Sequence, residues 1–171
     1  MIFKYCPDCG KKLTQKEIGD EGIVPFCDYC NRPLFSFSYP CVICLVMDKS
    51  QNIALIKQDY VSDNYICVAG YIKQGETTEQ TAKREVEEEM GLPVLTAKYI
   101  NSYYYKKRDN LMLGCVCTVE HCDFSISDEV DSAKWFSLGE AETQLRQGSI
   151  GKDLLMDYLK MIKKYTVTET E

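Results

Sequence analysis

The sequence predicts an α/β domain that follows a small N-terminal ribbon. Two pairs of closely spaced cysteines lie before residue 31, in a segment that has little apolar core of its own. From residue 41 on, apolar runs typical of strands alternate with segments of helical periodicity, which is the pattern of an α/β domain. We therefore expect two parts, a ribbon at 1–37 and a larger domain at 38–171.

The size and composition of the chain fit one globular domain with a small appendage. Of its 171 residues, 45% are hydrophobic and 27% are charged, as in globular proteins. No apolar run approaches the roughly 18 residues that cross a bilayer, and residues 1–12 lack the layout of a secretory signal. The net charge of −6 at pH 7 argues against a protein that coats nucleic acid. We expect no membrane partner, and nothing in the sequence indicates a nucleic-acid partner.

Four cysteines of the ribbon have the spacing of a zinc site. Cys6 and Cys9 form one C-x-x-C pair, Cys27 and Cys30 form a second, and seventeen residues separate the pairs. Two such turns each present two sulfurs, and four thiolates complete a tetrahedron around Zn²⁺. The alternative is two separate redox or buried pairs. Because the ribbon has little core, structural zinc would supply its folding energy.

The other cysteines fit core packing better than metal binding. Cys41 and Cys44 are also a C-x-x-C pair, but they lie in an apolar run that predicts a buried strand. Cys67, Cys115 and Cys117 lie in similar runs, whereas Cys122 is unassigned. Reduced thiols together with a zinc site indicate a cytoplasmic protein.

The larger domain predicts three strands, a helix, three strands and two helices. The strands are placed where Val, Ile, Tyr and Cys concentrate between turn residues: 41–48, 52–58, 64–69, 94–105, 111–120 and 133–136. Ser137 and Glu140 form a capping box for the first terminal helix. The second helix carries an apolar stripe made by Leu154, Leu155, Tyr158, Leu159 and Ile162. We expect residues 166–171 to fray.

The helix predicted at 77–90 has an acidic face. Glu85 is three residues before Glu88 and four before Glu89, so these three side chains share one face. Clustered carboxylates repel one another unless a cation lies among them, and hard oxygen ligands suit Mg²⁺ or Mn²⁺. The alternative is a solvated acidic face. Gly91 is placed to end this helix in the left-handed conformation.

The full spacing around this helix resembles the Nudix box. Gly70 is followed after five residues by Glu76, and after seven more by Arg84-Glu85-Val86-Glu87-Glu88-Glu89-Met90-Gly91-Leu92. All nine defined positions of the box match. The resemblance implies a Nudix-type α/β/α sandwich with a mixed sheet, and a metal-dependent nucleotide pyrophosphatase.

The resemblance also implies roles for the matching residues. The metal ligands would be Glu85, Glu88 and Glu89. Glu85 is at the position that serves some members as general base, and Arg84 resembles the arginine that orients a catalytic glutamate. Glu76 resembles the glutamate that braces the loop–helix–loop, and Gly70 permits the tight loop. Metal ions would neutralise the pyrophosphate oxygens and lower the pKa of a bound water.

A second acidic segment, 128–136, resembles the family segment in which an acidic residue precedes a short strand. Glu129 matches a metal-ligating glutamate there, and a solvated loop acid is an equal alternative. Trp135 and Phe136 are most simply core residues.

The ribbon and the box together resemble the zinc-ribbon NADH pyrophosphatase branch. Only the ends of that branch's signature survive, at Ser102 and at Leu111-Met112, and its prolines and aromatic residues are replaced by three tyrosines and three cations. Tyr71 and Tyr105 fall where the branch places base-binding aromatic rings, so we expect them to contact substrate. Alternation along a half-buried strand is the other explanation for Tyr105.

We therefore expect a hydrolase that cleaves the pyrophosphate bond of a nucleoside-diphosphate-linked substrate, such as NADH or a related adenine dinucleotide. The resemblance also favours a homodimer. Two alternatives stay open: a hydrolase of nucleoside triphosphates, and a zinc-ribbon Nudix-fold protein that reads RNA or a protein partner. The intact glutamates favour an enzyme, because a binding protein does not need all of them.

Overall fold

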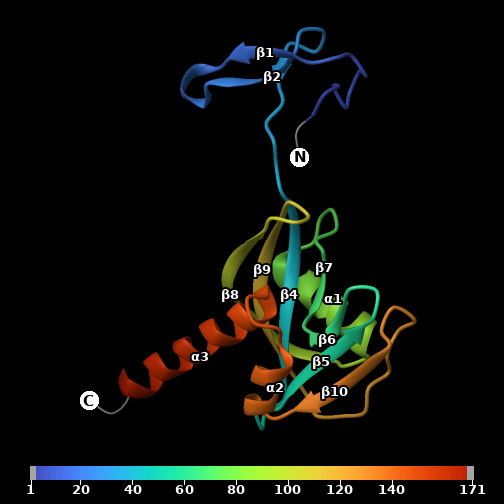
Figure 1. The fold of residues 1–171 in the computed structure, drawn as a ribbon, viewed down its shortest axis with the longest axis vertical. Helices are drawn as coiled ribbons and strands as arrows, with labels where there is room; N and C mark the ends of the chain where they lie inside the picture. Colours follow the sequence, from blue (N-terminus) through green and yellow to red (C-terminus); the bar gives the residue numbers. More distant parts are fainter. Residues whose placement is uncertain (1–2, 169–171) are drawn as a thin grey trace. The chain divides into compact units, whose positions relative to one another are not determined.

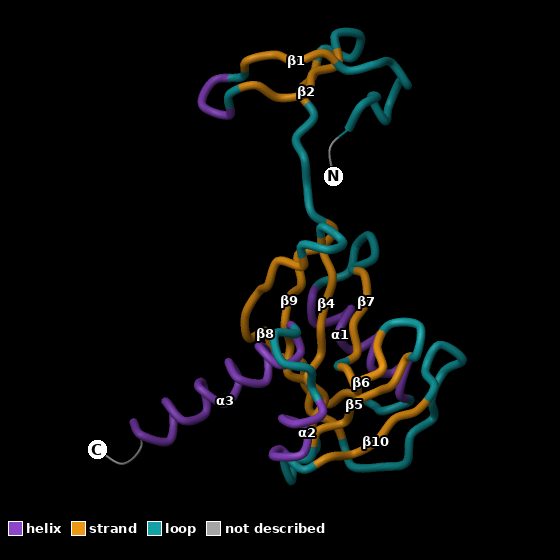
Figure 2. Tube along the Cα trace, in the orientation of Figure 1, coloured by secondary structure: helices purple, strands orange, loops and turns teal. Residues whose placement is uncertain are grey.

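A computed structural model describes residues 3–168 of the chain. Its contacts divide the chain into two compact units, Met1–Tyr39 and Pro40–Glu171, shown in Figures 1 and 2. Each unit has its own buried core. No helix among residues 3–168 combines the length and the apolar character that crossing a bilayer requires.

The first unit contains a three-stranded antiparallel sheet. Its elements are β1 (Thr14–Glu17), the 3-10 turn η1 (Gly19–Glu21), β2 (Ile23–Cys27) and β3 (Arg32–Pro33). The sequence did not reveal these strands, because they are short and β1 is exposed along its whole length. The core of this unit is small and consists largely of cysteines: Cys6, Cys27 and Leu34 are buried, with Cys9 and Cys30 packed against them.

The second unit is built on a larger sheet in which β4 is central. The strand order is β10-β5-β4-β9-β8, while β6 pairs with β5 and β7 pairs with β4. The strands are β4 (Tyr39–Met47), β5 (Ile53–Gln58), β6 (Ser62–Ile66), β7 (Val68–Tyr71), β8 (Val94–Tyr105), β9 (Asn110–Val119) and β10 (Ser132–Phe136). The helices are α1 (Thr78–Met90), α2 (Leu138–Gln144) and α3 (Ile150–Thr168).

One strand prediction was wrong. The predicted strand 64–69 is two strands, because β6 pairs with β5 whereas β7 pairs with β4, and the chain changes partner at Cys67. A local pattern of apolar residues carries no information about such a change of partner. Every other predicted strand lies within two residues of an observed one.

The predicted bounds of α1, to within one residue, and the predicted start of α2 are confirmed. Helix α1 begins at a capping box between Thr77 and Gln80 and ends at Gly91, whose φ of 69° is left-handed. The predicted box of Ser137 and Glu140 begins α2. Helix α3 continues to Thr168, beyond the start of the predicted fraying, and residues 169–171 lie outside the described part.

The two faces of the sheet bury two different apolar clusters. Val42, Cys44 and Val46 of β4 pack in a cluster with residues of α1, and the alternate β4 residues pack in a cluster with residues of α2 and α3. Helix α1 therefore covers one face of the sheet, and α2 and α3 lie on the other (Figure 1). Burial on both faces explains the continuous apolar run of β4.

The predicted core cysteines are buried. Each of the following is at most 3% exposed: Cys41, Cys44, Cys67, Cys115 and Cys117. All ten cysteines are free, and Cys122 is exposed. The five buried thiols therefore serve as small apolar side chains in the second unit.

Candidate functional site

The guanidinium of Arg84 connects the loop before α1 to the acidic face of that helix. Its Nε and Nη2 donate to the two carboxylate oxygens of Glu76, at 2.7 and 2.9 Å. Its Nη1 donates to Glu85 at 2.7 Å and to Glu88 at 3.0 Å, and Nη2 also donates to the carbonyl oxygen of Tyr71 at 3.1 Å. A planar, five-donor guanidinium is the side chain suited to such a set of acceptors.

Glu76 is the most strongly held of these carboxylates. It also accepts from the Thr81 hydroxyl at 2.8 Å and from the Lys73 amide at 3.0 Å. The hydrogen bonds from Arg84 are the main reason that the pKa of Glu76 falls to about 2, and Glu76 in turn raises the pKa of Arg84. Glu76 is therefore ionised at neutral pH and braces the loop against the helix.

Glu89 is buried without a partner for one of its oxygens. The residue is 6% exposed, and its Oε2 has no hydrogen-bond partner among the described residues. Burial, followed by the charges of Glu85, Glu129 and Glu88, raises the pKa of Glu89 to about 8. A buried carboxylate beside three others is costly unless a cation joins them. The donor set, made of carboxylate oxygens, fits Mg²⁺ or Mn²⁺.

Gly70 makes room for Glu85. A Cβ atom built on Gly70 would lie 2.0 Å from the Cδ and Oε1 atoms of Glu85. Gly70 pairs with Val42, so it faces the α1 side of the sheet. Gly70 lies within strand β7 and not in the tight loop that was expected. Glycine is needed here because the Glu85 side chain comes close to the backbone, and not because the chain turns.

The segment 125–131 brings Glu129 to the same cluster. The amide of Ser125 donates to the Met90 carbonyl at 2.9 Å, and the amide of Ser127 donates to the Glu89 carbonyl at 3.3 Å. The segment therefore lies against the C-terminal end of α1. Glu129 is exposed, and its charge acts on Glu89. The charges of Glu85, Glu88 and Glu129 thus all act on Glu89, and we call these four residues the carboxylate cluster.

Tyr71 and Tyr105 lie on the sheet face opposite α1. Tyr71 pairs with Cys41 across β7 and β4, and directly opposed residues share a face. Cys41 belongs to the core cluster under α2 and α3, and Tyr105 packs against the same cluster. Tyr71 is 51% exposed, whereas Tyr105 is half-buried. The two rings lie on the same face of the sheet. Strands β4 and β9 lie between β7, which carries Tyr71, and β8, which carries Tyr105.

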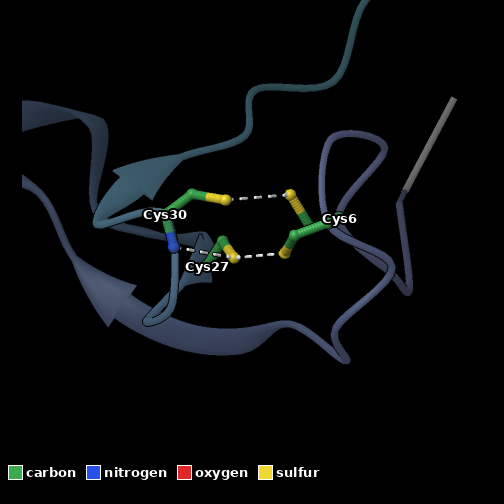
Figure 3. Close-up of side chains that lie close together, drawn as sticks. Cys6, Cys27 and Cys30 are labelled. Carbon is green, nitrogen blue, oxygen red and sulfur yellow. Dashed lines mark hydrogen bonds between the residues drawn. The ribbon is translucent and has the colours of Figure 1, made fainter.

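The four ribbon cysteines converge. Their sulfur atoms all lie within 4.8 Å of one another, with Cys6 and Cys30 at 3.9 Å and Cys9 and Cys27 at 3.5 Å. Figure 3 shows the sulfurs of Cys6, Cys27 and Cys30 directed toward a common centre. Zn–S bonds of about 2.3 Å in a tetrahedron place sulfurs about 3.8 Å apart, so the cluster is compatible with zinc.

Both cysteine turns use the left-handed backbone region. Gly10 follows Cys9 with a φ of 71°, and Asn31 follows Cys30 with a φ of 52°. The Gly10 amide donates to the Cys6 carbonyl at 2.9 Å, and the Cys30 amide donates to the Cys27 sulfur at 3.4 Å. Glycine and asparagine are the residues that reach this region most easily.

The comparison with protein families decides the classification. Residues 38–158 match the NUDIX domain. The chain belongs to the Nudix family. Its fold agrees, because a Nudix hydrolase from Nitrosomonas europaea aligns with a TM-score of 0.68 at 20% identity, over 92% of this chain and 91% of that one. The fold is thus the expected Nudix-type α/β fold with a mixed sheet.

Similar full-length proteins carry two kinds of name. The chain is 31% identical over 159 residues to a protein of Pseudomonas aeruginosa named NAD-capped RNA hydrolase NudC, covering 91% of this chain and 55% of that protein. It is 30% identical over 148 residues to the mitochondrial NAD(P)H pyrophosphatase NUDT13 of Mus musculus, covering 84% and 41%. This Nudix chain therefore spans about half the length of the curated relatives that it matches.

Sequence reasoning missed some residues that shape the site. Thr81 completes the hydrogen bonds of Glu76, and Asp131 holds the β5–β6 turn by accepting from the Asp59 amide at 2.6 Å. The position of Thr81, four residues after Thr77 and three before Arg84, was a usable signal, because such spacings share a helix face. The contact of Asp131 with Asp59 spans 72 positions in sequence, and no local pattern indicates it.

Proposed function

We propose that this Nudix protein is a metal-dependent pyrophosphatase acting on an adenine dinucleotide such as NADH. The observation that carries the proposal is Glu89, which is buried with an unpartnered oxygen beside the other carboxylates. Without a cation at this place, a neutral side chain of similar volume at position 89 would stabilise the fold. The names of its curated relatives support the substrate class.

The residues of the cluster have separate proposed roles. Glu85, Glu88, Glu89 and Glu129 would hold Mg²⁺ or Mn²⁺, which would neutralise pyrophosphate oxygens and lower the pKa of a water. Arg84 positions Glu85 and Glu88 through its two hydrogen bonds, and Glu76 fixes Arg84. Glu85 would accept the proton of the attacking water. The water oxygen forms a bond to one phosphorus, and the bond from that phosphorus to the bridging oxygen breaks, releasing the other phosphate with its nucleoside.

We also propose roles outside the carboxylate cluster. Tyr71 and Tyr105 would contact the adenine from the sheet face that they share, since base stacking contributes about 1–3 kcal/mol per base. Cys6, Cys9, Cys27 and Cys30 would bind one structural zinc ion. Reduced thiols support a cytoplasmic location, and family resemblance supports a homodimer, which sedimentation equilibrium would test.

The proposed function is tested by product analysis. NADH, NAD-capped RNA, ADP-ribose and nucleoside triphosphates would each be incubated with the protein and Mg²⁺ or Mn²⁺, and the products identified by mass. We expect NADH to yield AMP and nicotinamide mononucleotide, with a lower kcat/KM in Tyr71→Ala. Turnover of triphosphates alone would overturn the dinucleotide assignment. Binding of RNA without turnover of any substrate would support the binding-protein alternative instead.

A further inference from the structure

The turn between β5 and β6 is fastened to the segment that carries Glu129. The amide of Asp131 donates to the Lys57 carbonyl at 2.9 Å, and the carboxylate of Asp131 accepts from the Asp59 amide at 2.6 Å. The turn itself is closed by the Val61 amide, which donates to the Gln58 carbonyl at 2.8 Å. The hydrogen bonds of Lys57 and Asp59 to Asp131 therefore fix the position of the turn relative to residues 129–131.

The same segment is fastened to the acidic helix. Ser127 donates to the Glu89 carbonyl at 3.3 Å, and Val130 donates to the Ser127 carbonyl at 3.1 Å. Val130 is 5% exposed and belongs to the core cluster under α1. Glu129 lies between Ser127, which is bonded to α1, and Asp131, which is bonded to the turn 58–61, so this segment connects the turn to the Glu89 end of the carboxylate cluster.

Tyr60 stands at the tip of this turn with its ring open to solvent. It is 73% exposed, and the next residue, Val61, is 49% exposed. Among residues 3–168, the Tyr60 hydroxyl has no hydrogen-bond partner. A small loss of hydration, followed by the charges of Glu129 and Glu89, raises the pKa of Tyr60. An aromatic face beside a phosphate-binding site is a ready surface for a nucleobase.

Tyr71 lies at the other end of the cluster. Its carbonyl accepts from Arg84, the residue that also holds Glu85, whereas the turn that carries Tyr60 is hydrogen-bonded through Asp131 to the segment of Glu129. Glu89 is the fourth residue after Glu85 on α1, which is a rise of about 6 Å along the helix axis. The turn 58–61 and the end of β7 thus lie at opposite ends of the carboxylate cluster, with the ring of Tyr71 on the sheet face opposite α1. A ligand whose two bases extend from a central pyrophosphate would reach both places.

We propose that Tyr60 is a specificity-determining residue that stacks on the nicotinamide half of the dinucleotide, while Tyr71 contacts the adenine half. This inference rests on the proposed function. It assigns the β5–β6 turn to recognition of the second base and leaves the chemistry to the carboxylate cluster. Loss of the Tyr60 ring should therefore affect binding of one product and leave the other unchanged.

The test measures the two halves separately. Calorimetry with AMP alone and with nicotinamide mononucleotide alone, in the presence of Mg²⁺, would compare wild type, Tyr60→Ala, Tyr60→Phe and Tyr71→Ala. We expect Tyr60→Ala to weaken nicotinamide mononucleotide about tenfold, with AMP unchanged and with KM for NADH raised more than kcat is lowered. Tyr71→Ala should do the reverse, and Tyr60→Phe should resemble wild type because it keeps the ring.

The controls separate this inference from the proposed function. Tyr99→Ala removes another half-exposed tyrosine, on β8, and should change neither affinity. If wild type cleaves NADH while Tyr60→Ala binds both mononucleotides normally, or loses AMP instead, the role of Tyr60 is wrong and the proposed function stands. If wild type cleaves no dinucleotide, both fail. A Tyr60→Phe variant as weak as Tyr60→Ala would also overturn stacking.

Discussion

Two C-x-x-C pairs of this chain have the same spacing and opposite structural roles. In the first unit, Cys6 and Cys9 lie on a turn, and their sulfurs converge with those of Cys27 and Cys30. In the second unit, Cys41 and Cys44 lie on strand β4, where residues three apart face opposite sides. Cys41 packs in the cluster under α2 and α3, and Cys44 packs in the cluster under α1. The backbone between two cysteines therefore decides whether they converge.

The two units also differ in how their candidate metal ligands relate to their cores. Four of the seven residues in the apolar cluster of the first unit are cysteines. In the second unit an independent apolar core is present, and Glu88 projects from it with a side chain 54% exposed. Loss of a ligand should therefore disrupt folding in the first unit and chemistry in the second.

The largest expected effect is on catalysis. Glu88→Gln keeps the size and helix propensity of the side chain but removes a charged ligand, so we expect kcat with NADH to fall by about three orders of magnitude or more. The melting temperature should change little, because the side chain is half-exposed. Glu87→Gln is the matched control, since Glu87 accepts from the Val94 amide and glutamine can still do so. Near-normal kcat in Glu88→Gln at saturating Mg²⁺ would contradict the assignment.

The cysteine pairs provide the next test. Cys9→Ser should release the zinc and unfold the first unit, because metal binding supplies the folding free energy of such small sites. Metal analysis should find about one zinc per wild-type chain, and amide spectra should show loss of order in residues 3–39 alone.

Cys44→Ser is the matched variant in the strand pair. It should keep the zinc but lower the free energy of unfolding of the second unit by about 1–3 kcal/mol, because a hydroxyl is placed in an apolar cluster. Equal zinc loss in both variants, or an ordered metal-free ribbon, would remove the distinction between the pairs.

The smallest expected effect concerns stability of the second unit and its pH dependence. Glu89 has a pKa of about 8 in the folded chain, against an ordinary value of 4.5. Between these two values the folded protein keeps a proton that the unfolded chain releases, so the free energy of unfolding falls as pH rises from about 4.5 to 8. Glu89→Gln removes this dependence.

Melting curves of metal-free protein check this prediction. We expect the melting temperature of Glu89→Gln to exceed that of wild type by a few degrees at pH 8, with a smaller difference near pH 5. The same variant should have lost activity, because it lacks a ligand. If the melting temperatures of the two proteins changed in parallel with pH, the burial of Glu89 would not affect its ionisation.

Local patterns predicted the elements of this chain well. The cap at Ser137, the left-handed end at Gly91 and the convergence of the ribbon cysteines follow from residue types at short spacing. The partner change at Cys67 and the burial of Glu89 do not, because both depend on contacts between distant segments. Helical spacing places Glu85, Glu88 and Glu89 on one face, but only packing decides that Glu89 is buried while Glu88 is exposed.

The last carbonyls of α1 accept hydrogen bonds from a segment that is distant in the sequence. Met90 and Glu89 accept from the amides of Ser125 and Ser127, so any local opening that frees the segment also exposes the end of the helix and moves Glu129 away from Glu89. The amide protons of Ser125 and Ser127 exchange with solvent only during such openings. Their exchange rates therefore measure how often the carboxylate cluster separates, and a cation that joins Glu89 to Glu129 slows both rates together.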